Sequence, residues 1–225
     1  MQFVIKKALY VDTDLLCLND ISELFHVNLD NFIALVTEDA ISSILEKHCR
    51  NIGMQENSYF NSGVLLINIP EYIKYDIGKK AVKLAQDKNY IYMDQDVLNI
   101  LLENKVKIDI TYKYNCTMSV SDSQIPDIID IVHFTGSQKP WKAYTTLWGS
   151  NKDPIPFKKS KSKWKYQYYA LWRQYAAESP WADVPYDTPK NVHEWRWLSD
   201  MYRKNGEFIK AVKAYYRYVT AKLST

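Results

Sequence analysis

The stretch ALYVDTDLL, residues 8–16, is the most informative part of this 225-residue chain. Apolar residues lead into two carboxylates and then resume, a pattern typical of a buried strand. Asp12 and Asp14 are two positions apart, so an extended backbone points both side chains to the same side. Two like charges repel there, and a hard divalent cation with oxygen ligands would relieve the repulsion. The stretch therefore predicts a strand, over 8–16, that carries a cation site.

Short apolar runs alternate with helical patterns through the first two thirds of the chain. This alternation favours an α/β layer fold. Besides 8–16, we predict strands at 32–37, 64–68, 106–110 and 128–133. We predict helices at 20–25, 73–87 and 94–102.

Composition excludes several classes of protein. Apolar residues make up 47% and charged residues 24% of the chain, as in ordinary globular domains. Apolar runs all fall short of the roughly 20 residues of a membrane-spanning helix, and the N-terminus lacks a signal-peptide layout. The three cysteines are too far apart for a zinc site and fit a reducing compartment. We therefore expect a cytoplasmic location.

Charge divides the chain into two parts. Residues 1–150 have a net charge of −5 and residues 151–225 a net charge of +8, with half of all aromatic residues in the second part. This shift predicts a domain boundary near residue 150 and a basic, aromatic-rich helical extension over 151–225. We predict helices at 166–178, 194–204 and 207–223, the last two forming a hairpin at Asn205-Gly206. The hairpin resembles one tetratricopeptide unit, but a small helical cap is the favoured interpretation, because solenoids need several copies.

Four further motifs follow the paired aspartates: YFNSG at 59–63, DQD at 94–96, HFTG at 133–136 and KPW at 139–141. Each alone has an ordinary structural explanation. An Asn-Ser-Gly sequence is usually a turn, acidic residues favour the start of a helix, and a single histidine after a strand is usually structural.

Together, in this order, the motifs resemble the pattern of glycosyltransferase family 8. That pattern is a strand with Asp-x-Asp, a Phe-Asn-Ser/Ala-Gly strand, a helix starting at Asp-Gln-Asp, and His-x-x-Gly-x-x-Lys-Pro-Trp. The resemblance covers about residues 8–148. It implies a GT-A type fold, a UDP-sugar donor, a divalent metal (Mn²⁺, with Mg²⁺ as the alternative) and transfer with retention at the anomeric carbon. The C-terminal part looks like the extension of the lipopolysaccharide core glucosyl- and galactosyltransferases.

The resemblance also implies roles for individual residues. The metal ligands would be Asp12, Asp14 and His133, and a mixed oxygen and imidazole set suits manganese. The catalytic residues would be Asp94 and Gln95, which would steady an oxocarbenium-like centre during attack from the leaving-group face. The donor-binding residues would be Asn61, Ser62, Gly136 and Lys139. The Lys139 ammonium would neutralise the diphosphate, and Gly136 would let the backbone approach it.

Eleven residues precede Asp12, whereas members of the family carry several strand–helix units there. We expect the chain to hold the metal and acceptor half of a GT-A domain that lacks its first units, and to bind a nucleotide sugar weakly or not at all. A truncated, inactive remnant or interaction module is the alternative to an active enzyme.

The other rival is a haloacid-dehalogenase-like phosphatase, which also begins with a strand and Asp-x-Asp. That class usually has Thr or Val where this chain has Leu16, although Asp94 and Asp96 could imitate its later acidic pair.

A transferase of this family implies UDP-glucose or UDP-galactose and a lipid-anchored lipopolysaccharide core as substrates. The interleaved lysines and aromatic residues of Lys158–Lys165 would bind an anionic bilayer surface. We therefore expect a peripheral protein at the cytoplasmic face of the inner membrane. The acidic first part argues against nucleic acid as a partner.

Overall fold

The computed structural model describes residues 5–40, 43–54, 58–145 and 164–224. The chain divides into two compact units, Met1–His133 and Phe134–Thr225, and each is described by itself. The boundary near residue 150 that composition suggests stays a prediction.

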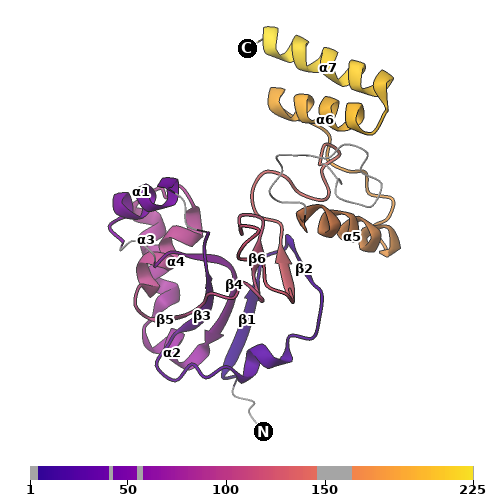
Figure 1. Cartoon of the computed structure of the whole chain (residues 1–225). Coiled ribbons are helices and arrows are strands. Elements are labelled where there is room, and N and C mark those ends of the chain that lie inside the picture. The colour runs from indigo at the N-terminus through magenta and orange to yellow at the C-terminus, as the bar shows by residue number, and fades with distance from the viewer. Residues whose placement is uncertain (1–4, 41–42, 55–57, 146–163, 225) are drawn as a thin grey trace. The chain divides into compact units, whose positions relative to one another are not determined.

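A four-stranded sheet lies at the centre of the first unit, in the order β1-β4-β3-β5 (Figure 1). β4 is antiparallel to both of its neighbours, and β3 is parallel to β5. The strands are β1 (Lys7–Val11), β3 (Ala34–Glu38), β4 (Phe60–Asn68) and β5 (Val106–Asp109). The strands predicted at 32–37, 64–68 and 106–110 are confirmed, with β4 starting earlier, at Phe60.

Helices cover one face of this sheet (Figure 1). They are α1 (Ser43–Ile52), α2 (Ile69–Lys74), α3 (Ile77–Asp87) and α4 (Met93–Leu102). Successive side chains of β3 point to opposite faces of the sheet, as in any strand, and they pack in two different apolar clusters. Ala34 and Val36 pack with residues of α3 and α4, whereas Leu35 packs with Leu24 of the 3₁₀ helix η1 (Ser22–His26). The two central strands, β3 and β4, are therefore covered on both faces.

One predicted helix is wrong, and one helix of the structure was not predicted. The single helix predicted at 73–87 is wrong, because Asp76 has a φ of +52° and separates α2 from α3. A left-handed residue breaks the repeating hydrogen bonds of a helix. The sequence interpretation also lacked α1, although Leu45, Cys49 and Ile52 follow helical spacing and pack in one cluster.

The prediction of one strand over 8–16 is also wrong. β1 ends at Val11, and β2 (Leu15–Cys17) belongs to a second sheet with the order β2-β7-β6. The other strands of that sheet are β6 (Cys116–Thr117) and β7 (Ile131–His133). Asp12 still donates its backbone N–H to the Gly63 carbonyl at 2.8 Å, so pairing with β4 lasts until the chain crosses over. The paired aspartates thus lie at the joint between two sheets.

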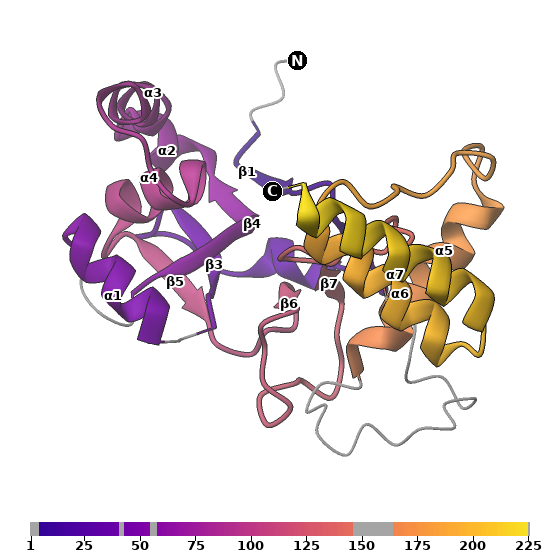
Figure 2. The same cartoon turned by 90° about the horizontal axis from the view of Figure 1, so that it is seen from above.

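The second unit contains three helices among its described residues: α5 (Trp164–Glu178), α6 (Val192–Lys204) and α7 (Phe208–Leu223). α6 and α7 lie side by side, as Figure 2 shows. The predicted hairpin is confirmed: Gly206 has a φ of +76°, which glycine adopts without a steric penalty. Leu198, Ala214 and Tyr144 form the buried centre of the cluster there. In the part of the chain that the structure describes, no helix is long and apolar enough to cross a membrane.

Candidate metal centre

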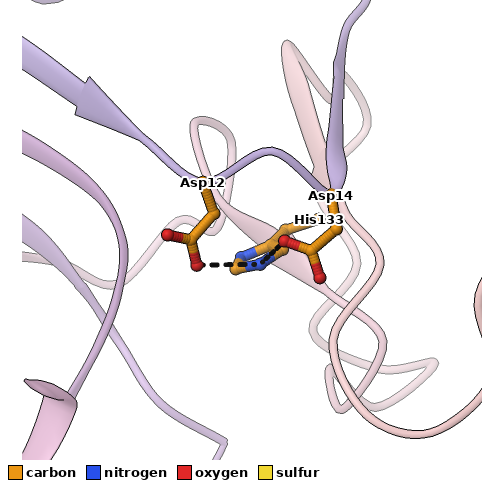
Figure 3. A group of neighbouring side chains, drawn as sticks. All are labelled: Asp12, Asp14 and His133. Carbon is orange, nitrogen blue, oxygen red and sulfur yellow. Dashed lines mark hydrogen bonds and ion pairs between the residues drawn. The ribbon is translucent and has the colours of Figure 1, made fainter.

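Three side chains converge at the joint between the two sheets (Figure 3). His133 Nε2 lies 3.1 Å from Asp14 Oδ1 and 3.6 Å from Asp12 Oδ2. One candidate ligand atom from each residue lies within 4.8 Å of the others. The register of the second sheet explains this arrangement, because β2 pairs Leu15 with His133 and so places the imidazole beside Asp14.

The three residues fit a divalent cation. Ligand atoms about 2.1 Å from one octahedral ion lie about 3 Å apart, which is close to the spacing seen here. The His133 side chain is 3% exposed, and those of Asp12 and Asp14 are 35% and 17% exposed, so one side of the cluster is closed and the other is accessible. Two carboxylates and an imidazole form a donor set that manganese accepts.

Gly63 leaves the space in which these side chains meet. A Cβ at this position would lie 2.1 Å from His133 Cε1 and 2.8 Å from Asp12 Oδ2. Real Cβ atoms do not approach carbon or oxygen so closely, so any other residue would displace the cluster. Gly63 belongs to the YFNSG motif, but the sequence interpretation assigned it no role.

Asp12 has a second partner on its own strand. The Tyr10 hydroxyl donates a hydrogen bond to Asp12 Oδ1 at 2.8 Å. This bond, together with burial and the negative charges nearby, raises the pKa of Tyr10 to about 12. The bond leaves Oδ2 of Asp12 directed at His133.

Hydrogen-bonded amides connect the cluster to the other predicted residues. His133 Nδ1 lies 3.0 Å from Asn115 Oδ1, and Asn115 Nδ2 donates to Asn61 Oδ1 at 2.9 Å. Asn61 Nδ2 donates in turn to Gln95 Oε1 at 3.2 Å. Residues from β7, β4 and α4 are thereby joined within a single chain of contacts.

Gln95 is held by three groups. Its Oε1 accepts from the Ser62 backbone N–H at 3.1 Å as well as from Asn61, and its Nε2 donates to Asp39 Oδ2 at 3.2 Å. Burial raises the pKa of Asp39 above its ordinary value. Asp39 follows directly after β3, but it lacks the paired carboxylate two positions away that identified Asp12 and Asp14, and the sequence interpretation assigned it no role.

Asp94 and Asp96 lie in different environments, because residues two apart on a helix do not face each other. Asp94 is exposed and lines a groove of about 420 Å³ between α3 and α4. Asp96 is fully buried and accepts hydrogen bonds from Tyr59 (2.6 Å) and from the Tyr92 N–H (3.0 Å), with His48 Nε2 at 2.7 Å. The paired acidic site that a phosphatase would need is therefore not formed by these two aspartates.

Gly136 and Lys139 belong to the second unit and are described within it. Gly136 has a φ of +82°, a backbone conformation that favours glycine. Lys139 Nζ donates to the Phe134 carbonyl at 2.5 Å and lies 5.9 Å from the centre of the Trp141 ring. Their contact with a diphosphate stays a prediction.

Comparison with known proteins decides the family. The model of Glycosyl transferase family 8 matches residues 3–145, well over half of the chain. The chain belongs to glycosyl transferase family 8. The family's C-terminal model matches residues 166–222 of this family-8 chain, so the helical hairpin is part of the family's C-terminal region.

The family-8 chain resembles several lipopolysaccharide enzymes. It is 28% identical to the lipopolysaccharide 1,3-galactosyltransferase of Salmonella typhimurium, over 96% of this chain and 63% of that protein. It is 26% identical to the lipopolysaccharide glucosyltransferase WaaO of Escherichia coli K12, over 96% of this chain and 62% of that protein. The chain thus spans somewhat less than two thirds of the length of these relatives.

Solved structures show the fold. The galactosyltransferase LgtC, crystallised with donor and acceptor sugar analogs, matches with a TM-score of 0.56 and 22% identity, over 85% of this chain and 65% of that one. The glycosyltransferase GlyE of Streptococcus pneumoniae matches with a TM-score of 0.51 and 20% identity, over 84% of this chain and 46% of that one. The predicted GT-A type α/β fold is therefore confirmed, and the family match sets aside the phosphatase alternative.

Proposed function

We propose that this family-8 chain carries the metal centre of a retaining glycosyltransferase that moves glucose or galactose from a UDP-sugar to a lipopolysaccharide core saccharide. The observation that carries the proposal is the cluster of Asp12, Asp14 and His133, joined through amide hydrogen bonds to Gln95. The names of the relatives supply the substrate class, because both act on lipopolysaccharide.

Asp12, Asp14 and His133 would hold the cation, with Mn²⁺ preferred and Mg²⁺ as the alternative. When bound, such an ion is a Lewis acid that stabilises the negative charge developing on the leaving diphosphate. Lys139 would add a positive charge to the same group, and Gly136 would let the backbone come close.

The sugar would lie against the amides of β4 and α4. Asn61 and Ser62 are buried and fix the Gln95 oxygen with two hydrogen bonds, which preorganises that dipole. An amide is a poor nucleophile, so we propose attack on the leaving-group face, with Gln95 and Asp94 steadying the positive charge of an oxocarbenium-like centre. A covalent sugar adduct trapped on either residue would contradict this mechanism.

Hexose transfer tests the proposal. The chain would be incubated with Mn²⁺, UDP-glucose or UDP-galactose, and a lipid-bearing lipopolysaccharide core, and UDP release and the anomeric configuration of the product would be measured. Because we also expect this chain to bind the nucleotide sugar weakly, we expect slow transfer, with the donor's configuration retained, and none from an Asp14→Asn variant. Cation binding without transfer would favour the remnant alternative, and an inverted product would refute the mechanism.

We also propose that the chain acts at the cytoplasmic face of the inner membrane, as a peripheral protein. The predicted contact, Lys158–Lys165, lies largely outside the described residues. Within α7, Ile209, Val212 and Tyr216 are 76%, 69% and 68% exposed and share one face, beside the exposed cations Lys213 and Arg217. An apolar stripe beside basic residues suits an anionic bilayer surface. Flotation with phosphatidylglycerol vesicles tests this; a chain that stays at the bottom of the gradient at low salt would refute it.

A further inference from the structure

Asn115 is the buried residue that contacts both sides of the proposed site. It is fully buried, it lies directly before β6, and its two amide atoms face His133 and Asn61. A buried amide of this kind keeps one orientation when each of its atoms has a partner of the opposite type. The orientation can be derived from the backbone.

The backbone of Gly63 provides the starting point. Its N–H can only donate, and it donates to Asn61 Oδ1 at 3.0 Å, so the oxygen of the Asn61 amide is identified. The Asn115 atom that lies 2.9 Å from this oxygen must also be a donor, and it is therefore Nδ2. The other Asn115 atom, Oδ1, then faces His133.

This orientation fixes the tautomer of His133. Asn115 Oδ1 can only accept, so His133 Nδ1, at 3.0 Å, must carry a hydrogen. Nε2 of the neutral ring then presents its lone pair to Asp14 Oδ1 at 3.1 Å and Asp12 Oδ2 at 3.6 Å. Three acceptors that face one another repel unless a positive charge lies between them.

We propose that Asn115 is a positioning residue, which holds His133 as the Nδ1–H tautomer and joins this ligand to the amides at the sugar side of the site. The proposal rests on the proposed function in one respect, namely that the cluster binds a divalent cation. The partner of a ligating histidine sets the ring's orientation, and its loss typically lowers metal affinity 10- to 100-fold. Asn115 is not marked by any sequence motif, because its role depends on contacts with residues 18 and 54 positions away.

The tautomer can be measured without metal. Ring nitrogen shifts of the ¹⁵N-labelled, metal-free chain would be recorded about two pH units above the ordinary imidazole pKa of about 6.5, with a His133→Gln variant for assignment. We expect a protonated Nδ1 for His133 in the wild type and in Asn115→Asp, whose carboxylate still accepts, and loss of this preference in Asn115→Leu. A wild-type His133 that carried a hydrogen on Nε2 and none on Nδ1 would overturn the proposal.

Metal affinity provides the second readout. Binding of Mn²⁺ alone would be followed by the electron paramagnetic resonance signal of the free ion, for Asn115→Leu and for the matched control Asn99→Leu. Asn99 is also fully buried and exchanges two hydrogen bonds with the Phe60 backbone, without touching a metal ligand.

We expect a 10- to 100-fold loss of affinity in Asn115→Leu only. Equal affinities for the two variants would refute the proposal. If Asn115→Leu failed to fold, the nitrogen shifts of wild-type His133 would decide, because the proposal requires a hydrogen on Nδ1. A wild type that bound no Mn²⁺ would refute the proposed function, while the nitrogen shifts would still decide the tautomer.

Discussion

Replacing Gly63 by alanine should destroy the metal centre while leaving the sheet in place. The added Cβ would lie 2.1 Å from His133 Cε1, whereas ordinary contacts begin at 3.4 Å, so the ring must move by about 1.3 Å. Metal ligands tolerate displacements of only about 0.2 Å. His133 is 2% exposed and belongs to β7, so it has little room to yield.

We therefore expect Gly63→Ala to lower Mn²⁺ affinity at least 100-fold, which is about 2.7 kcal/mol. Overpacking of a filled site also costs about 1–3 kcal/mol of folding stability. Isothermal titration with Mn²⁺ and thermal unfolding measure the two effects.

Gly78→Ala is a matched control. Its Cβ would meet only the Tyr72 side chain, at 3.5 Å, and in the helix α3 alanine is favoured over glycine by about 1 kcal/mol. This variant should melt at a higher temperature and bind Mn²⁺ as the wild type does. If Gly63→Ala bound Mn²⁺ within threefold of wild type, the geometry described for the cluster would be wrong.

Two further predictions concern side chains next to the site. Asp96→Asn should lower the free energy of unfolding by about 1–3 kcal/mol, because its amide NH₂ would meet donors where the carboxylate accepts from Tyr59 and the Tyr92 backbone. The control Asp94→Asn, at an exposed position, should melt like wild type. Equal melting temperatures for the two variants would count against the buried network. Tyr10→Phe tests the raised pKa of Tyr10. The folded chain favours the neutral hydroxyl, so the hydrogen bond to Asp12 stabilises the folded state fully below pH 10.0, and this stabilisation is lost as the pH rises through about 12. The stability difference between wild type and Tyr10→Phe, followed by urea unfolding of the metal-free chains, should therefore shrink across this window, and a constant difference would contradict the assignment.

The sequence predicted the parts of the fold that local patterns determine. The apolar runs of β3, β4 and β5 and the hairpin at Gly206 are confirmed, because periodicity and glycine preference are local properties. The position of Asp12 and Asp14 was predicted, but not the change of sheet between them, which depends on what β2 pairs with across more than a hundred residues.

The site was predicted as far as motifs extend. The cluster of the two aspartates with His133 was expected from a family resemblance, and the structure brings these side chains together. Asn115 and Asp39 could not be predicted from the sequence, because the role of a single polar residue depends on the side chains that it contacts in the folded chain. Asp76 likewise gave no local sign that it would adopt a positive φ and divide a helix.

Because the chain crosses from one sheet to the other at residues 12–14, a cation bound there would link the two sheets. Asp12 continues the pairing of β1 with β4, whereas Asp14 and His133 flank the pairing of β2 with β7. An ion held by all three would tie together backbone segments that are more than a hundred residues apart in the chain. At a free concentration of about 100 times its dissociation constant it would stabilise the folded chain by about 2.7 kcal/mol. Chelation would then loosen the small sheet first, and the amide hydrogens of β2 and β7 would exchange with solvent before those of β3 and β4.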